Sequence, residues 1–188
     1  ELLNFCTVDL SAFYFDIRKD TLYCDAKDSE KRKKCIQVLN IILESLVKWF
    51  APILSFTTEE IFMLIKKDEK SIHLLEFMNY PESFKNLKLN EKWKELKKIR
   101  EICNISIEAK RASKEIGSSL EAELTINLND KLFNELNNID FAEICITSSA
   151  ELKKTELGEI TVIANKAEGR KCPICWKINK KGCERHPI

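Results

Sequence analysis

Residues 5–25 read FCTVDLSAFYFDIRKDTLYCD, an apolar helical segment that passes abruptly into a charged one. Its apolar side chains fall into two stripes at helical spacing, Phe5, Val8, Ala12 and Phe15 in one and Leu10, Phe13 and Ile17 in the other. A helix that is apolar on more than one side has to be buried by other helices. The sequence therefore predicts a core helix that ends in an exposed, charged corner at residues 16–20.

The composition is that of an ordinary soluble protein built mainly from helices. Of the 188 residues, 44% are apolar and 32% are charged, and the small numbers of Gly (4) and Pro (4) argue against a turn-rich β protein. The net charge of +1 identifies no nucleic-acid binder. The sequence has no apolar run long enough to cross a bilayer and no secretion signal, so we expect a cytoplasmic protein without membrane contact. Because it begins with Glu1, we expect it to be a piece of a longer chain.

Two helices joined by a sharp corner are expected between residues 29 and 66. The first carries a seam of apolar residues spaced by three and four, namely Ile36, Leu39, Leu43, Leu46 and Phe50. Pro52 ends this helix, because proline cannot donate to the helical hydrogen-bond ladder. Thr57 and Glu60 have the spacing of a capping box and predict the start of the second helix.

A long helix is predicted from Asn90 to Ile116, after a connection over residues 67–89. It carries two apolar stripes, a first of Leu96, Ile99, Cys103 and Ile107 and a second of Ile102, Ile105, Ala109, Ala112 and Ile116. Gly117 follows at the place where a helix often ends on a left-handed glycine. Four cations lie largely off the stripes, Arg100, Lys110, Arg111 and Lys114. They fit a ladder along an RNA backbone, but the glutamates between them favour a merely solvated face.

After Gly117 the period changes from helical to alternating. Leu120, Ala122, Leu124, Ile126 and Leu128 alternate with polar residues, which is typical of a half-buried strand. Residues 130–137 read as a short helix, and residues 142–147 and 160–164 read as two more strands. We expect a helix packed on a small sheet.

The strongest chemical signal is at the end of the sequence. Cys172 and Cys175 are separated by two residues, and so are Cys183 and His186. Three thiolates and one imidazole are ligands suited to zinc, and four protein ligands leave no open position for water. The pattern predicts one structural zinc ion. A disulfide between Cys172 and Cys175, or a chance spacing, are the alternatives.

Basic residues and one aromatic surround these four residues, namely Arg170, Lys171, Trp176, Lys177, Lys180, Lys181 and Arg185. Cations interleaved with an exposed aromatic suit a nucleic acid, through phosphate contacts and base stacking. Trp176 could equally be the small core of the metal-binding segment itself. We interpret this cluster as the best candidate RNA surface, with the four cations of the long helix as a second one.

Four separate motifs resemble those of bacterial isoleucyl-tRNA synthetases, in the same order. They are DLSAFYFDIRKDTLYCD (residues 9–25), KWFAPILSFTTEE (48–60), IGSSLEAELTI (116–126) and KAEGRKCPICWK (166–177). The resemblance implies a mainly α fold: a helical anticodon-binding bundle of the class I synthetase type over residues 1–117, a small α/β element over 118–168 and a zinc knuckle over 169–188. It implies a monomeric segment that holds the anticodon arm of an isoleucine tRNA and contacts the rest of the same synthetase chain.

The resemblance also places ATP binding and catalysis in the missing body of the synthetase, because motifs of the HIGH and KMSKS type are absent here. We therefore predict no catalytic residue. The family usually has two cysteines as its second ligand pair, so either His186 replaces a cysteine or the fourth ligand lies beyond residue 188. The matching region of a valyl-, leucyl- or methionyl-tRNA synthetase and a zinc-stabilised helical adaptor that binds protein are the alternative functions. Only a tRNA binder should lose affinity steeply as salt rises.

Overall fold

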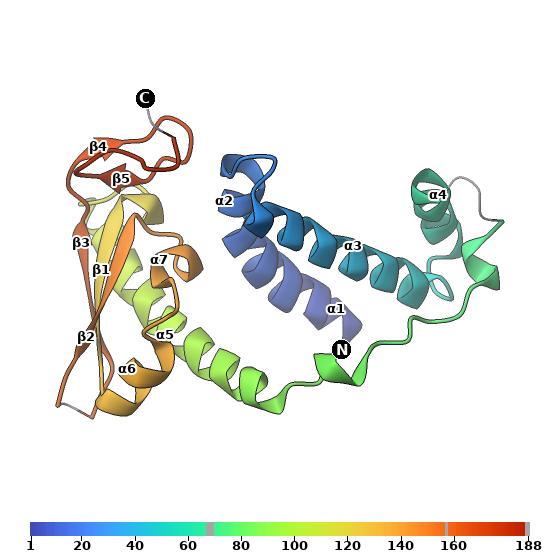
Figure 1. The fold of residues 1–188 in the computed structure, drawn as a ribbon, viewed down its shortest axis with the longest axis horizontal. Helices are drawn as coiled ribbons and strands as arrows, with labels where there is room; N and C mark the ends of the chain where they lie inside the picture. Colours follow the sequence, from blue (N-terminus) through green and yellow to red (C-terminus); the bar gives the residue numbers. More distant parts are fainter. Residues whose placement is uncertain (67–69, 157, 187–188) are drawn as a thin grey trace. The chain divides into compact units, whose positions relative to one another are not determined.

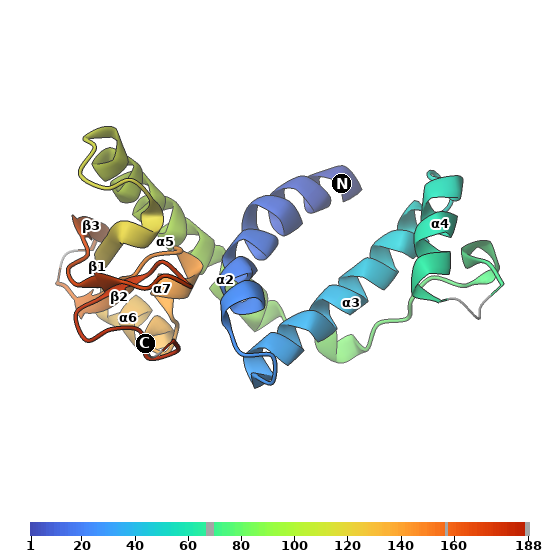
Figure 2. The same ribbon diagram turned by 90° about the horizontal axis from the view of Figure 1, so that it is seen from above.

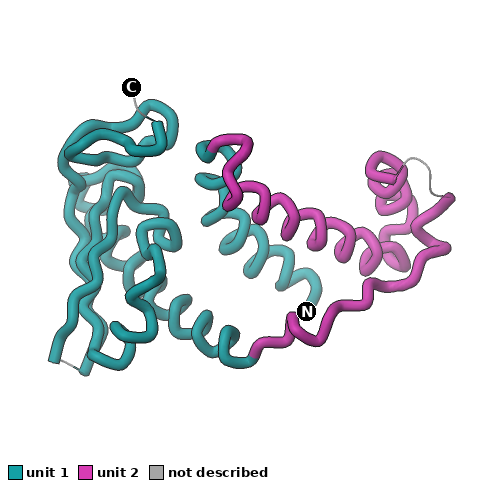
Figure 3. The backbone as a smooth tube through the Cα atoms, viewed as in Figure 1, with its two compact units in different colours: residues 1–25, 87–188 teal, residues 26–86 magenta. Residues whose placement is uncertain are grey.

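The structure is a computed structural model that describes residues 1–66, 70–156 and 158–186 (Figure 1). Residues 1–25 and 87–188 form one compact unit and residues 26–86 form the second (Figure 3). The division therefore joins the beginning of the chain to its last hundred residues. The three consecutive segments expected from the sequence remain a prediction about domains. Among the described helices, none has the length and apolar character that crossing a membrane requires.

The N-terminal segment is one continuous helical run, α1 (Leu2–Asn4), the π-helix η1 (Phe5–Phe15) and α2 (Asp16–Cys24). Leu10 is the buried residue of η1, whereas the side chain of Val8 is 52% exposed. The prediction of a core helix is therefore wrong in part: Leu10 and Ile17 of the second stripe are buried, but Val8 and Phe15 of the first are exposed. Stripes counted on a period of 3.6 do not apply to a π-helix, whose hydrogen bonds run from i to i+5. In α2, Ile17 and Thr21 are buried.

The second unit contains α3 (Glu30–Phe50), α4 (Ser55–Ile65) and two single 3₁₀ turns, η2 (Ile72–Leu74) and η3 (Glu82–Phe84). The end of α3 before Pro52 is confirmed. The predicted seam is wrong in part, because Ile36 and Leu43 are exposed while Cys35, Ser45 and Val47 are the buried residues of α3. The core of this unit consists of Val47, Ala51, Phe62 and Ile72.

The predicted capping box at the start of α4 is also wrong. The helix begins at Ser55, so Thr57 lies inside it, and Leu54 is an N-cap without a side-chain hydrogen bond. Instead the chain turns tightly after α3, with the N–H of Leu54 donating to the carbonyl of Phe50 at 2.7 Å. This turn places the N-cap three residues earlier than predicted, at Leu54 instead of Thr57. Residues 67–69 of the predicted connection lie outside the described residues.

The long helix α5 (Leu87–Ala112) begins and ends earlier than predicted. Its first apolar stripe is confirmed, since all four of its residues are buried. The second stripe is wrong in part, because Ile105 is 71% exposed, whereas Ile116 is buried in the main core. Gly117 does not end the helix either: Lys114, with φ of 59°, takes the left-handed position three residues earlier.

The α/β part follows α5 through the 3₁₀ turn η4 (Ser119–Glu121). Its sheet has the order β2-β1-β3, with β1 (Ala122–Leu128) parallel to β2 (Ser149–Lys154) and antiparallel to β3 (Thr161–Lys166). The register pairs Glu123 with Ser149 and Asn127 with Thr161. Helices α6 (Asp130–Leu136) and α7 (Phe141–Ile144) connect β1 to β2. The long helix α5 lies alongside this sheet (Figures 1 and 2).

The alternation predicted for β1 is confirmed, since the residues of its apolar face are buried and the residues between them are not. The short helix at residues 130–137 and the strand near residues 160–164 are confirmed as α6 and β3. The strand predicted at residues 142–147 is wrong: Asp140 caps α7 there by accepting from the N–H of Glu143 at 3.1 Å. The main core of the first unit joins the apolar face of β1 to the first stripe of α5 and to α6 and α7.

Candidate metal centre and nucleic-acid interface

A small hairpin brings the four predicted metal ligands together. Its strands are β4 (Arg170–Lys171) and β5 (Ile178–Asn179), and we call residues 169–186 the knuckle. The turn between the strands is closed by the N–H of Cys172 donating to the carbonyl of Lys177 and by the N–H of Trp176 donating to the carbonyl of Cys172. Trp176 adopts a φ of 62° to close this turn. Cys172 and Cys175 therefore project from one tight loop.

Three of the distances between the ligand atoms are close to those around a tetrahedral ion. The three sulfurs and the His186 ring nitrogen all lie within 4.8 Å of one another. Sγ of Cys175 is 3.7 Å from Sγ of Cys183, and Nδ1 of His186 is 3.3 Å from Sγ of Cys183 and 3.5 Å from Sγ of Cys172. Two thiolates bound to one zinc at about 2.3 Å would be about 3.8 Å apart, and a thiolate and an imidazole nitrogen about 3.6 Å. The four residues can therefore hold a metal ion.

The alternative of a disulfide does not apply to the described part of the chain, in which all eight cysteines are free. Cys172 and Cys175 are buried, and Cys183 is half-buried. Backbone hydrogen bonds, first from Cys175 and then from Ile174, lower the pKa of the Cys172 thiol to about 6. Burial raises the pKa of the Cys175 thiol to about 11. A metal-binding group needs thiolates, and the loop already stabilises one at neutral pH.

The knuckle is also fastened to the end of α2. Nε2 of His186 is 2.7 Å from the carbonyl oxygen of Cys24. The guanidinium of Arg185 contacts both carboxylate oxygens of Asp20 at 2.8 Å and one of Asp25 at 2.7 Å. These contacts join residues more than 150 positions apart.

The cations predicted to contact RNA from the knuckle differ in their surroundings. Arg170, Lys171, Lys180 and Lys181 are exposed, and Trp176 is 60% exposed. Two of the lysines form ion pairs, Lys171 with Glu121 at 3.3 Å and Lys180 with Glu168 at 2.8 Å. The alternative in which Trp176 forms the core of the knuckle is wrong at this exposure. Arg185, in contrast, is already held by Asp20 and Asp25.

The cations predicted on the long helix are not one continuous group. Arg100 is half-buried, donates from Nε to the carbonyl of Ile144 at 2.9 Å and lies over the ring of Phe13. Lys110 and Arg111 form ion pairs at 2.7 Å with Glu115 and Glu108. Lys114 is exposed at the left-handed position that ends the helix. The surroundings of Arg100 are those of a packing residue.

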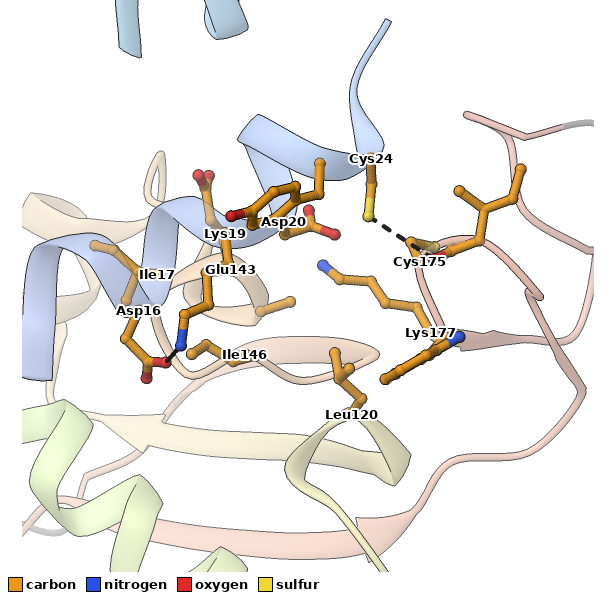
Figure 4. Close-up of a pocket in the computed structure, with 14 residues that line it drawn as sticks. Asp16, Ile17, Lys19, Asp20, Cys24, Leu120, Glu143, Ile146, Cys175 and Lys177 are labelled. Carbon is orange, nitrogen blue, oxygen red and sulfur yellow. Dashed lines mark hydrogen bonds and ion pairs between the residues drawn. The ribbon is translucent and has the colours of Figure 1, made fainter. Parts of the chain in front are cut away.

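A cavity of about 380 Å³ lies between α2 and the knuckle (Figure 4). Its walls are largely apolar and include Ile17, Leu120, Ile146, Ile174 and Trp176. Lys177 reaches into its rim, and Sγ of Cys24 donates to the carbonyl of Ile174 on the knuckle at 3.9 Å. The exposed aromatic and the half-buried Lys177 thus belong to one hollow beside the metal ligands.

Sequence reasoning missed Asp20, Cys24 and Asp25 as neighbours of the metal ligands. All three stand in the first motif, where nothing local points to a knuckle 160 residues away. The available signal is the pair of aspartates on either side of Cys24, whereas the sequence predicts only an exposed, charged corner at residues 16–20.

Comparison with known proteins gives one family and a consistent set of relatives. The family model described as the anticodon-binding domain of tRNA ligase matches residues 1–126. An isoleucine–tRNA ligase of Pelagibacter ubique is 73% identical over 186 residues, which are 99% of this chain and 21% of that protein. Isoleucine–tRNA ligases of Agrobacterium fabrum and Bartonella henselae are 42% and 40% identical, over 94% and 95% of this chain and 19% and 20% of theirs. The chain spans about one fifth of the length of these curated relatives.

Proposed function

The chain belongs to the anticodon-binding domain family of tRNA ligases, and we propose that it is the segment of an isoleucine–tRNA ligase that binds the anticodon arm. The observation that carries the proposal is the family match over residues 1–126, together with relatives named isoleucine–tRNA ligase that cover nearly the whole chain. The segment would act as a monomer in the cytoplasm, joined to the rest of its synthetase chain.

The segment would contribute binding energy and position rather than chemistry. Holding the anticodon arm in one orientation brings the acceptor end of the same tRNA to a distant active site. The bimolecular step then becomes effectively unimolecular. ATP and the aminoacylation chemistry belong to the catalytic body of the parent enzyme in this proposal.

We further propose that the knuckle holds one structural zinc ion through Cys172, Cys175, Cys183 and His186. Two observations support this: the distances among the four ligand atoms, and the soft and borderline donors that the residues offer. Zinc would supply cross-linking, because four protein ligands leave no position for a substrate or water. The loop would then present its basic side chains on a fixed backbone.

For the RNA surface, we propose the exposed side chains of the knuckle, chiefly Arg170, Lys180, Lys181 and Trp176. Cations at intervals neutralise phosphates without base specificity, while an exposed aromatic offers a face for an unstacked base. Lys171, Lys177, Lys110, Arg111 and Lys114 are further candidates. Arg100 and Arg185 contribute less in this proposal, because carboxylates and a carbonyl already engage them.

The direct test is binding of the zinc-loaded chain to an isoleucine tRNA transcript and to the same transcript with an altered anticodon. We expect tighter binding of the native anticodon, and a steep loss of affinity for both as salt rises, because phosphate contacts release counterions. Equal binding of both would remove anticodon recognition from the proposal. No binding to either would favour a protein-binding adaptor.

A pair of variants tests the surface itself. Lys180→Gln with Lys181→Gln should weaken tRNA binding and reduce the salt slope by roughly one to two, since each phosphate contact contributes about 0.9 to that slope. The matched control replaces Lys131 and Lys153, exposed lysines of α6 and β2, by Gln. An equal loss in both double variants would point to the net charge of the chain rather than to the knuckle.

A further inference from the structure

We propose that Asp20 and Asp25, at the end of α2, are positioning residues for the metal centre: together with the Cys24 carbonyl they hold Arg185 and His186 so that Nδ1 of His186 faces the three thiolates. The proposal rests on the metal site proposed above and adds residues outside the ligand motif. It also assigns Arg185 a different role from the RNA contact predicted from the sequence.

The orientation of His186 follows from its two hydrogen-bonding partners. A carbonyl oxygen can only accept, so the contact of 2.7 Å between Nε2 and the Cys24 carbonyl puts the proton on Nε2. In the neutral imidazole, the form that binds a metal, the lone pair is then on Nδ1, which lies 3.3 Å and 3.5 Å from the sulfurs of Cys183 and Cys172. A metal-bound histidine commonly donates its second ring N–H in this way, which fixes both tautomer and ring orientation.

The carbonyl that His186 uses is available because of where α2 ends. Cys24 is the last residue of α2, and Asp25 continues with an extended backbone at ψ of 150°. The last carbonyls of a helix have no partner within the helix. The imidazole of His186 therefore supplies a hydrogen-bond donor to the last carbonyl of α2, and this hydrogen bond in turn orients the imidazole.

Arg185 makes the second connection, one residue before the ligand. Its two terminal nitrogens form parallel bonds to the two carboxylate oxygens of Asp20, and Nη1 also contacts Asp25. Such bidentate pairs are geometrically specific, because a planar guanidinium matches a planar carboxylate. The side chains of Asp20 and Asp25 are 20% and 10% exposed, so water competes little for them.

The coupling between α2 and the metal must act in both directions. If the end of α2 favours the ligating orientation of His186, metal binding favours the ordered end of α2 by the same free energy. The contact between Cys24 Sγ and the Ile174 carbonyl ties the other half of the knuckle to the same residue. Removing the metal should therefore loosen residues 20–25, which contribute no metal ligand.

The test measures metal affinity by cobalt(II) titration, with the thiolate-to-cobalt absorption as readout and zinc competition to rank affinities. Asp20→Asn, Asp25→Asn and Arg185→Gln should each weaken affinity, by at most about the 10- to 100-fold that loss of a ligating histidine's own partner costs, because they act on His186 through its neighbour in the chain. Glu184→Gln is the matched control, an exposed carboxylate within the knuckle itself, and should bind cobalt as the unsubstituted chain does. Arg185→Lys keeps the charge without the paired bonds and should also be weaker.

Two further results decide the interpretation. The double variant of Asp20→Asn and Arg185→Gln should bind cobalt as Arg185→Gln alone does, because loss of the guanidinium already removes its contacts to Asp20 and Asp25. On metal removal, amide exchange at residues 21–24 should speed up in the unsubstituted chain but hardly change in Arg185→Gln. Amide exchange in the remaining helices of the same samples reports whether those helices are folded. Tight, unchanged cobalt binding in all three single variants would overturn the positioning role while leaving the metal site intact. Absence of binding in the unsubstituted chain would overturn the metal site and this inference with it.

Discussion

The N–H of Glu115 donates to the carbonyl oxygen of Lys110 at 3.1 Å, and its carboxylate lies 2.7 Å from the ammonium of the same lysine. Backbone and side chain of one residue thus both return to the last turn of α5. The N–H of Lys114 donates to the carbonyl of Arg111 at 3.0 Å, so the helix ends in a Schellman motif in which a lysine occupies the left-handed position.

Lys114→Gly should therefore stabilise the first unit. A side chain in the left-handed region costs about 1–2 kcal/mol and glycine's greater freedom when unfolded returns about 0.5–1 kcal/mol of this, so we expect a net gain of about 0.5–1 kcal/mol. Chemical denaturation followed by circular dichroism measures it. Gly117→Ala is the comparison: its Cβ would approach nothing closer than 3.6 Å, so no loss is expected. If Gly117→Ala lowers the free energy of unfolding and Lys114→Gly does not raise it, the left-handed residue that ends the helix is Gly117 and not Lys114.

The two stripes of α5 should differ sharply in their contribution to stability. Leu96 is 1% exposed in the main core, and Leu96→Ala should cost about 2–5 kcal/mol through lost burial and a residual cavity. Ile105, on the second stripe, is exposed, and Ile105→Ala should change the free energy of unfolding by no more than about 0.5 kcal/mol. Denaturant titrations of both variants check this, and comparable losses would mean that the second stripe is covered in solution.

Two glycines of the knuckle have left-handed backbones but different surroundings. A Cβ on Gly169, at φ of 128°, would lie 2.4 Å from backbone atoms of Asn179, whereas a Cβ on Gly182, at φ of 87°, would meet nothing within 4 Å. Gly182→Ala should cost about 1–2 kcal/mol for its conformation alone, and Gly169→Ala distinctly more.

Amide exchange at Cys172 and Trp176, whose N–H groups close the loop, would measure both effects locally. Faster exchange in Gly182→Ala than in Gly169→Ala would contradict the close approach of β5 to Gly169.

Glu121 should give the stability of the first unit a dependence on acid. Its carboxylate accepts from the N–H of Gly117 at 2.9 Å and pairs with Lys171, and these contacts, the first above all, lower its pKa below the usual 4.5. Because the folded-state pKa is the lower one, the stabilisation is present above about pH 4.5 and is lost as pH falls through the folded-state pKa. The Tm of the unsubstituted chain should therefore exceed that of Glu121→Gln at pH 7 and converge with it as pH falls through the folded-state pKa.

Glu135→Gln, on the exposed surface of α6, serves as the control for a general effect of charge. A difference between the unsubstituted chain and Glu121→Gln that grows toward acid pH would contradict the assignment.

Local patterns predicted those elements in which one face is buried. The alternation in β1 and the first stripe of α5 were visible because burial selects side chains at the period of the element. The same argument failed in part for η1, where the π-helical winding changes the period, and failed at residues 142–147, where the Asp140 cap outweighs the apolar run. Helix ends were the least predictable, because Lys114 takes a conformation that its residue type disfavours.

The four residues that can hold a metal ion could be predicted as a group because their spacing is local, and two pairs of neighbours suffice to recognise them. The residues that orient them could not, because Asp20 and Arg185 are 165 positions apart and no short-range period connects them. For the proposed RNA surface the sequence identifies the cations but not their exposure. Only the structure separates Lys181, which is exposed, from Arg100, which is packed.

The joining of residues 1–25 to residues 87–188 also has a consequence for the order of events during synthesis. A ribosome that adds about 5–20 residues per second needs on the order of 8–33 s to travel from Asp20 to Arg185, a distance of 165 residues. Throughout that interval α2 has emerged without the side chain that pairs with its aspartates, while residues 26–86 can already complete their own core. Residues 26–86 can therefore fold before residues 1–25, because residues 1–25 pack with a part of the chain that is synthesised last.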